Sequence, residues 1–363
     1  MNTFARTVIA WQRRAGRHDL PWQGTRDPYR IWLSEIMLQQ TQVGTVIPYY
    51  ERFTTTFPTV AALAYTDLDA VMRLWAGLGY YTRARNLHRA AIDVVERFGG
   101  AFPREREAIE SLPGVGRSTA AAIAAFAFGA REAILDGNVK RVLARHFAIE
   151  GFPGVREVEK TLWTRAESVL PRRGIEAYTQ GLMDLGATLC TLIKPRCTDC
   201  PLNASCQAYA AGTPERYPSP RPKKAVPHRT TTMLVLRDGD EILLEHRPPT
   251  GIWGGLWSFP ELADAKDAAL VAATRFGCKV GKGRRLAIVR HGFTHFSLDI
   301  QPFVAPVAAR SHQAAEPGAI WLSISEARRA AIPVPVKKIL TLLGDSLFLP
   351  GQAALFEEAE EDL

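Results

Sequence analysis

Four of the five cysteines of this chain lie between residues 190 and 206. They are Cys190, Cys197, Cys200 and Cys206, with the spacing C-x6-C-x2-C-x5-C. Thiolates this close in sequence can converge on one metal centre, and four of them suit either a tetrahedral zinc ion or an iron–sulfur cluster. The spacing differs from the ferredoxin patterns, so an iron–sulfur cluster here is expected to be structural rather than an electron carrier.

A carboxylate, Asp136, stands in the segment LDGNVKRVLAR, directly before a predicted helix. Aspartate is a common helix N-cap, and taken alone Asp136 is interpreted as a cap. The residues upstream give it a context. Residues 104–112 and 117–128 favour two helices, and Pro113-Gly114-Val115-Gly116 joins them by a tight turn. The sequence therefore predicts a helix-hairpin-helix over residues 104–129.

This hairpin has the features of a phosphate-binding unit. Gly114 and Gly116 allow the backbone to approach a phosphate closely, and Arg117 and Ser118 open the second helix, whose first amides form an anion site. Such a unit grips DNA without reading its sequence. Lys194 and Arg196, inside the cysteine cluster, are further candidates for phosphate contacts, although an ordinary solvated loop explains them equally well.

The elements that must position these residues divide the chain into two domains. Apolar residues recur at intervals of three and four through residues 1–212, which predicts an all-helical domain. Residues 213–229 hold five prolines and almost no aliphatic side chains, and we interpret them as a linker.

Residues 230–346 are predicted to form an α+β domain. TTMLVLR and EILLEHR flank Asp238-Gly239-Asp240, which predicts a β-hairpin. Further strands are expected at 286–289, 293–304 and 319–322, and helices near 263–276 and 334–343. Residues 347–363 form a short acidic tail.

Composition narrows the class of protein. The net charge of +8 favours a polyanionic partner. No stretch of about 18 apolar residues could span a membrane, and residues 1–20 lack the apolar core of a signal peptide. We therefore expect a cytoplasmic protein without a membrane segment.

Several motifs together resemble a known family. LPGVGRSTAAAI at 112–123, LDGNVKRVLAR at 135–145 and the four-cysteine loop resemble the helix-hairpin-helix DNA glycosylases of the endonuclease III superfamily. Within it, WLSEIMLQQTQV at 32–43, GLGYYTRARNL at 77–87 and RPPTGIWGGLWSFP in the second domain look like the adenine DNA glycosylases. The resemblance covers nearly the whole chain. It implies a mainly α glycosylase domain with a 4Fe–4S cluster loop at 190–206, a Nudix-like second domain, and a monomeric, nucleoid-associated bacterial protein.

The resemblance assigns chemical roles to three residues. It implies that Asp136 is catalytic and that Glu35 is the acid that protonates adenine, while Asn138 orients Asp136 or the sugar, or belongs only to the local turn. Partial burial of Glu35 among its apolar neighbours would raise its pKa. Loss of protonated adenine leaves an oxocarbenium-like sugar, which an ionised Asp136 stabilises.

The residue after Arg117 decides the reaction class. In the endonuclease III branch a lysine at this position attacks the sugar, whereas Ser118 has no amine for a Schiff base. Ser118 therefore predicts a monofunctional enzyme, and the resemblance implies a glycosylase of base excision repair that flips out and removes adenine mispaired with 8-oxoguanine or guanine.

The resemblance also implies how the opposite base is read. It places Gln40, Thr41, Leu78 and Tyr80 beside that base, with Tyr80 wedged into the stack. The second domain resembles Nudix hydrolases that act on 8-oxo-dGTP, and its family role is to read 8-oxoguanine. A loop that contacts the lesion is matched by Phe293, Thr294 and His295.

Three other functions compete with this prediction. A bifunctional glycosylase/lyase is opposed by Ser118, and a sensor that binds mismatches without cutting is opposed by the presence of both Glu35 and Asp136. A nucleotide hydrolase is opposed by the absence of the metal-binding Nudix signature after Gly254-Gly255.

One segment lies outside both domains. Gln352, Leu355 and Phe356 resemble the QxxLF peptides that dock into bacterial sliding clamps. Folding of Leu355 and Phe356 back onto the second domain is the alternative.

Overall fold

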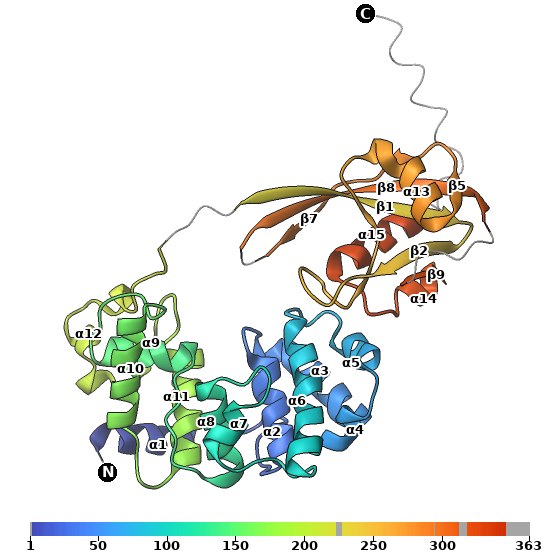
Figure 1. Cartoon of the computed structure of the whole chain (residues 1–363). Coiled ribbons are helices and arrows are strands. Elements are labelled where there is room, and N and C mark those ends of the chain that lie inside the picture. Colours follow the sequence, from blue (N-terminus) through green and yellow to red (C-terminus); the bar gives the residue numbers. More distant parts are fainter. Residues whose placement is uncertain (1, 223–226, 294, 312–317, 346–363) are drawn as a thin grey trace, which may run out of the picture. The chain divides into compact units, whose positions relative to one another are not determined.

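A computed structural model of the chain describes residues 2–222, 227–293, 295–311 and 318–345 (Figure 1). Its internal contacts divide the chain into two compact units. The first comprises Met1–Val71 and Thr82–Lys223, and the second comprises Met72–Tyr81 and Lys224–Leu363. Within the described part of the chain, no helix is both long and apolar enough to cross a membrane.

Residues 2–222 are helical and contain no strand, which confirms the all-helical prediction. The α-helices are α1 (Thr3–Ala15), α2 (Pro28–Leu38), α3 (Val43–Thr56), α4 (Val60–Ala64), α5 (Leu68–Trp75), α6 (Thr82–Phe98), α7 (Arg106–Glu110), α8 (Arg117–Phe128), α9 (Gly137–His146), α10 (Arg156–Ser168), α11 (Ile175–Asp184) and α12 (Gln207–Ala210). Short turns of other helix types follow α11 and α12, at η1 (Leu185–Leu189), η2 (Cys197–Asp199), η3 (Asn203–Ser205) and η4 (Pro214–Arg216).

Helix α2 is central to the first unit. Its N-terminus is set by Asp27, whose side chain accepts a hydrogen bond from Tyr29 N, and by Pro28 at the first helical position. Ile31, Trp32 and other apolar residues of α2 are buried. The helix packs against α3, α6 and α8 (Figure 1).

The predicted helix-hairpin-helix is present as α7, a turn and α8. Helix α8 covers the predicted residues and ends at Gly129, whose φ of 68° is the left-handed conformation that glycine adopts without strain. Helix α7 is shorter than the predicted 104–112, because Leu112 already belongs to the turn. In that turn Gly114 has a φ of 79°, and a Cβ atom there would lie 2.8 Å from Cβ of Asn86. Only glycine fits this position.

The second unit is built on one twisted mixed sheet. Its strands follow the order β3-β2-β1-β8-β5, in which β1 and β8 are parallel and β1 and β2 are antiparallel. Its helices are α13 (Ala268–Phe276), α14 (Ile324–Ala327) and α15 (Val334–Asp345), with a short turn η5 (Ala265–Asp267) before α13. The strands are β1 (His228–Asp238), β2 (Glu241–His246), β3 (Trp257–Ser258), β4 (Glu261–Leu262), β5 (Cys278–Val280), β6 (Arg284–Arg285), β7 (Val289–Gly292), β8 (Ser297–Arg310) and β9 (Ala319–Ser323).

The predicted hairpin is confirmed, since Arg237 of β1 pairs with Ile242 of β2. The single strand predicted at 286–289 is wrong for its first three residues. Arg285 pairs with Phe303, and Val289 pairs with Ile300. Three residues therefore lie between Arg285 and Val289, whereas only two lie between their partners on β8. The extra residue prevents regular pairing, and β6 and β7 are separate strands. The strand predicted at 293–304 begins only at Ser297 and runs to Arg310.

Candidate active site

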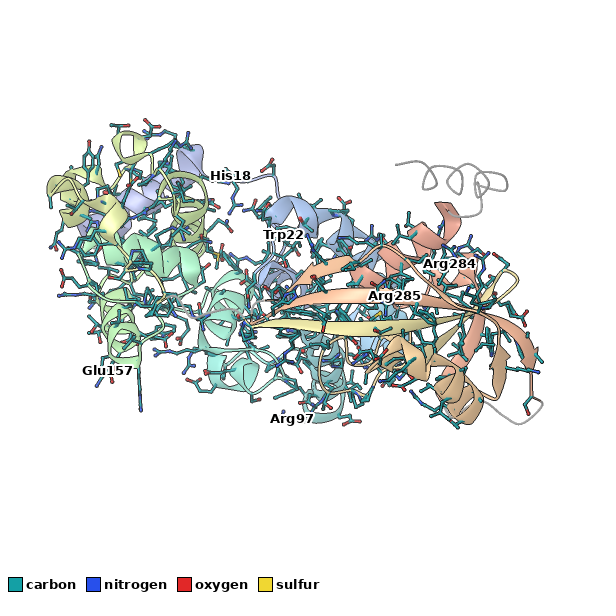
Figure 2. All side chains as sticks on the ribbon, turned by 90° about the horizontal axis from the view of Figure 1, so that it is seen from above. His18, Trp22, Arg97, Glu157, Arg284 and Arg285 are labelled. Carbon is teal, nitrogen blue, oxygen red and sulfur yellow. The ribbon has the colours of Figure 1, made fainter. Side chains whose placement is uncertain are left out.

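Glu35 lies on α2 and lines a pocket of about 480 Å³ within the first unit. Leu20, Trp22 and Val43 supply apolar walls, and the side chain of Gln180 is polar. Figure 2 shows Trp22 in the loop that connects α1 and α2. The pocket therefore combines apolar walls with polar and charged side chains such as Arg17 and Glu35, as expected of a site that binds a small molecule in a fixed orientation.

The electrostatics of this pocket favour a protonated Glu35. Burial and, to a lesser degree, the neighbouring Asp136 carboxyl together raise the pKa of Glu35 from 4.5 to about 8. Loss of solvation disfavours the charged form, and a second negative charge adds to that effect. Glu35 therefore carries a proton at neutral pH and can donate it.

Asp136 occupies the N-cap of α9, as the sequence indicated. Its side chain accepts a hydrogen bond of 2.8 Å from Val139 N, and Asn138 Nδ2 lies 3.4 Å from its Oδ2 atom. Burial raises the pKa of Asp136, and the donated hydrogen bonds and the nearby Arg141 oppose that shift. A cap does not exclude a catalytic role, because the electrostatic interaction between Asp136 and Glu35 indicates that the two carboxyls lie near each other.

Arg141 links this carboxylate to the cysteine loop. It donates from Nη2 to Asn138 Oδ1 at 2.8 Å and to Gly186 O at 2.6 Å, and from Nε to Cys190 O at 2.6 Å. Asn138 is thereby fixed between Arg141 and Asp136. A Cβ atom on residue 186 would lie 2.4 Å from Cβ of Asn138. Only glycine therefore allows the backbone at position 186 to pack this closely on Asn138.

Ser118 is directed toward the active-site segment. Its Oγ atom accepts a hydrogen bond of 2.9 Å from Leu135 N, the residue before Asp136. Arg117 forms an exposed ion pair of 2.5 Å with Glu167 and stacks over the ring of Trp163. Lys140, the amine nearest in sequence to Asp136, is paired with Glu159 at 2.5 Å.

The four clustered cysteines line one small pocket. Burial, together with the negative charge of the neighbouring thiolates, raises the pKa values of Cys197, Cys200 and Cys206, the pKa of Cys200 to about 11. Such a set of adjacent thiols suits a cationic metal centre, which stabilises thiolates. Among the residues that the structure describes, no three His, Cys, Asp or Glu side chains are close enough to hold one metal ion.

A buried arginine organises this loop. Arg145 is 2% exposed and donates to Cys190 Sγ at 3.3 Å, and its other hydrogen bonds go to backbone carbonyls, including Thr191 O and Pro214 O. Lys194 and Arg196 are exposed on the same loop, Lys194 with a φ of 49° and Arg196 bonded to Thr188 O.

The predicted readers of the opposite base belong to two segments. Gln40 and Thr41 follow α2, and Gln40 has a φ of 58°, which is unusual for a residue other than glycine. Leu78 and Tyr80 lie in the short segment of the second unit. Leu78 is buried, whereas Tyr80 is 47% exposed and also has a positive φ, of 49°. An exposed ring on a strained backbone suits a wedge.

In the second unit Phe293 lies in an aromatic cluster. It stacks on Phe296 with centroids 4.4 Å apart, and Trp253 and His291 also contact it. His295 is exposed in the same loop. Thr294, Gln352, Leu355 and Phe356 lie outside the described residues.

Comparison with known proteins places the chain in a family. The HhH-GPD model of base excision DNA repair proteins matches residues 33–168, and a NUDIX domain model matches residues 231–342. The chain is 36% identical to the adenine DNA glycosylase of Buchnera aphidicola from Acyrthosiphon pisum, over 95% of this chain and 99% of the relative. The chain belongs to the adenine DNA glycosylase family.

Other relatives of this glycosylase cover different extents. It is 33% identical to the human adenine DNA glycosylase, over 93% of this chain and 73% of the human protein. A solved structure of a thermostable thymine-DNA glycosylase is 34% identical, covers 57% of this chain and 95% of its own, and superposes with a TM-score of 0.53. The helical unit is therefore shared with glycosylases whose names give a different base.

Several residues of the site were not found from the sequence. The Arg17 backbone N and side chain donate to Asp184 at 2.9 and 2.6 Å, and Gln180 Nε2 donates to the same carboxylate at 2.9 Å. Asp184 is fully buried. The only sequence signal was one acid within the apolar run GLMDLGATL.

Proposed function

We propose that this protein is a monofunctional DNA glycosylase that removes adenine mispaired with 8-oxoguanine or guanine, by base flipping and acid-assisted hydrolysis. The observation that carries the proposal is a glutamic acid, Glu35, that is protonated at neutral pH, lines a pocket of about 480 Å³ and lies near enough to the Asp136 carboxyl for that group to raise its pKa. The names of the relatives, adenine DNA glycosylases over nearly the full chain, support adenine as the base.

The reaction needs two carboxyls in different states. Glu35 donates its proton to a ring nitrogen of the flipped adenine, which makes the base a better leaving group. Burial raises the pKa of Asp136, and its hydrogen-bond donors and Arg141 oppose that shift. In its ionised form Asp136 would stabilise the positive charge that develops on the sugar. Water then adds to the sugar carbon from which adenine has departed and passes its proton to the Glu35 carboxylate, which restores the acid. Asn138 and Arg141 hold Asp136 in place through the hydrogen bonds described above.

The pocket can distinguish the base by its exocyclic group. A carboxylate only accepts hydrogen bonds, so the Gln180 amide must turn its NH2 group to Asp184. Its carbonyl oxygen is then the atom that can accept from the 6-amino group of adenine. Hypoxanthine carries a 6-oxo group instead, and it would be disfavoured at this position.

The residues at positions 118 and 140 favour hydrolysis without strand cleavage. Position 118 is serine, and its hydroxyl is occupied by Leu135 N. Lys140 is engaged with Glu159. Ser118 has no amine with which to form a Schiff base, and the amine of Lys140 is held in an ion pair.

Cys190, Cys197, Cys200 and Cys206 would hold a 4Fe–4S cluster, which when bound cross-links the ends of this loop. Arg145 and Arg141 bind the same loop from α9, the helix that Asp136 caps. Exposed Lys194 and Arg196 on this loop, and the amides at the start of α8 beside Gly114 and Gly116, would contact phosphates.

The second unit would read 8-oxoguanine through Phe293, Thr294 and His295. The contacts of Phe293 with Trp253 and Phe296 favour a fixed position for the Phe293 ring. Deletion of residues 230–363 should leave excision opposite guanine largely intact while it reduces the preference for 8-oxoguanine. Equal loss on both substrates would make the domain a stabilising element only.

A docking role for Gln352, Leu355 and Phe356 completes the proposal. A peptide of residues 350–363 should bind a bacterial sliding clamp with a Kd in the micromolar range, which corresponds to a binding free energy on the order of −8 kcal/mol. Replacement of both Leu355 and Phe356 by alanine should abolish this binding without changing the rate of adenine excision from short duplexes. Unchanged binding would remove the motif from the account.

The proposed base specificity is tested by chromatographic identification of the released base. Duplexes with adenine opposite 8-oxoguanine, guanine or cytosine are compared with thymine opposite guanine. Adenine should be released fastest opposite 8-oxoguanine. Release of thymine alone would assign the chain the activity named for its shorter relative.

A further inference from the structure

Arg83 is a buried arginine outside the pocket that binds the end of the helix carrying Glu35. It is the second residue of α6 and is 8% exposed. Its Nη1 atom lies 3.0 Å from Ile36 O, 2.8 Å from Met37 O and 2.7 Å from Gln39 O. Its Nη2 atom donates to Thr41 Oγ1 at 3.1 Å. One guanidinium thus contacts the segment 36–41 at four points.

The charge of Arg83 is explained by α2 rather than by its own helix. A cation at the N-terminus of α6 is unfavourable for that helix, because the positive end of the helix dipole lies there. The last carbonyls of α2 are left without helical partners and carry the negative end of a dipole. Arg83 therefore acts as a C-terminal cap of α2 supplied by another helix.

The segment capped by Arg83 adjoins both the proposed acid and two of the proposed readers of the opposite base. Glu35 precedes Ile36 in the last turn of α2, and Gln40 and Thr41 follow the end of the helix. Gln40 is held at a φ of 58°, and Thr41 N bonds back to Leu38 O at 3.2 Å. A left-handed glutamine is costly, so contacts around it must fix this turn.

The same turn contacts the helix-hairpin-helix. Gln39 Nε2 lies 3.4 Å from Gly114 O, and Gly114 in turn packs closely on Asn86 of α6. Helix α6 thus supports both the turn after α2 and the phosphate-binding turn. If the phosphate-binding turn holds the DNA backbone, a shift of segment 39–41 would change the position of Gln40 and Thr41 relative to the DNA.

We propose that Arg83 is a positioning residue through which adenine excision depends on the opposite base. This inference rests on the proposed function. Arg83 does not line the pocket that contains Glu35. Through Gln39 O and Thr41 Oγ1 it fixes the turn that carries Gln40 and Thr41, directly after the helix of Glu35. A correct opposite base then favours the reactive geometry, and a wrong base does not.

The test compares single-turnover adenine excision opposite 8-oxoguanine and opposite cytosine in the full-length protein. Arg83→Lys keeps the charge but replaces the planar fork by one ammonium, which cannot bridge the same four acceptors. The ratio of the two rates should fall on the order of 10-fold to 100-fold, the loss expected for a misplacement of about 1 Å. A ratio that stays at the wild-type value while both rates fall with the melting temperature would overturn the proposal.

Arg131→Lys is the control. Arg131 also donates to backbone carbonyls, Pro171 O at 3.0 Å and Leu170 O at 3.1 Å, but neither carbonyl belongs to segment 36–41, and Arg131 is exposed. Its variant should keep the wild-type ratio, and an equal fall there would show that the ratio reports general destabilisation. Failure of the proposed function and failure of the proposed role of Arg83 give different results. If the proposed function is wrong, the wild-type protein releases adenine from no duplex.

Hydrogen exchange of the wild-type protein provides a test that needs no stable variant. The Thr41 amide should be protected before DNA is added, because the turn is already fixed. Exchange at the rate of an open loop would contradict the role of Arg83.

Discussion

Replacement of Glu35 by glutamine should abolish excision and, at alkaline pH, stabilise the fold. The pKa of about 8, against an ordinary 4.5, means that at pH 7 about nine in ten Glu35 side chains hold a proton. An ordinary glutamate would hold one in only about three of a thousand molecules. Burial thus raises the fraction of active acid roughly 300-fold.

The same shift makes Glu35 unfavourable for folding once it ionises. The folded state binds the proton more tightly than the unfolded chain does, so the stabilising contribution is complete below pH 4.5 and is lost as pH rises to about 8. Each pKa unit corresponds to about 1.4 kcal/mol, which puts the loss on the order of 3 to 5 kcal/mol above pH 8. Glutamine has no charge at any pH and avoids this loss.

Urea unfolding of wild type and Glu35→Gln at pH 5 and pH 9 measures this effect. The variant should gain relative stability between the two pH values, while Glu51→Gln, an exposed position on α3, should show no such change. The excision rate of the wild type should fall about tenfold per pH unit above pH 8. Equal stabilities at both pH values, or a variant less stable at pH 9, would refute the assigned environment of Glu35.

Three further predictions concern the rest of the site. Asp136→Asn should keep a side-chain oxygen for Val139 N but lower excision on the order of 100-fold or more, because a neutral amide cannot stabilise the cationic sugar; wild-type rates would leave Asp136 as a helix cap alone. The purified protein should be brown and contain four irons per chain, measured by metal analysis and visible absorption, and stoichiometric zinc in anaerobically prepared protein would replace the cluster in this account. Borohydride should trap little protein–DNA adduct, and cleavage of the strand should need added base, because position 118 is serine; cleavage that matches base release in rate would restore a lyase.

Local pattern was sufficient for the parts of the site whose chemistry depends on neighbours in sequence. The cysteine spacing, the PGVG turn and the Asp136 cap are all set within about twenty residues, and the structure has the hairpin and the cap where the sequence indicated them. The roles of Glu35 and Ser118 came from the family resemblance, since neither residue type is distinctive alone.

Contacts between distant segments were not predictable. Arg83 binds carbonyls more than forty residues away, and Arg141 binds Cys190 O at a separation of 49 residues. Backbone carbonyls exist at every residue, so no side-chain pattern marks which of them an arginine will reach. The interruption between β6 and β7 was missed for a similar reason, because it depends on the register with β8 and not on the residues 286–288 themselves.

The most direct measurement of the central claim is the release of free adenine, under single-turnover conditions, from a duplex with adenine opposite 8-oxoguanine. Wild-type protein should release adenine and leave an intact abasic strand, and Glu35→Gln should bind the same duplex and release none. Absence of adenine release by the wild type, or equal release by the variant, would contradict acid-assisted excision by Glu35.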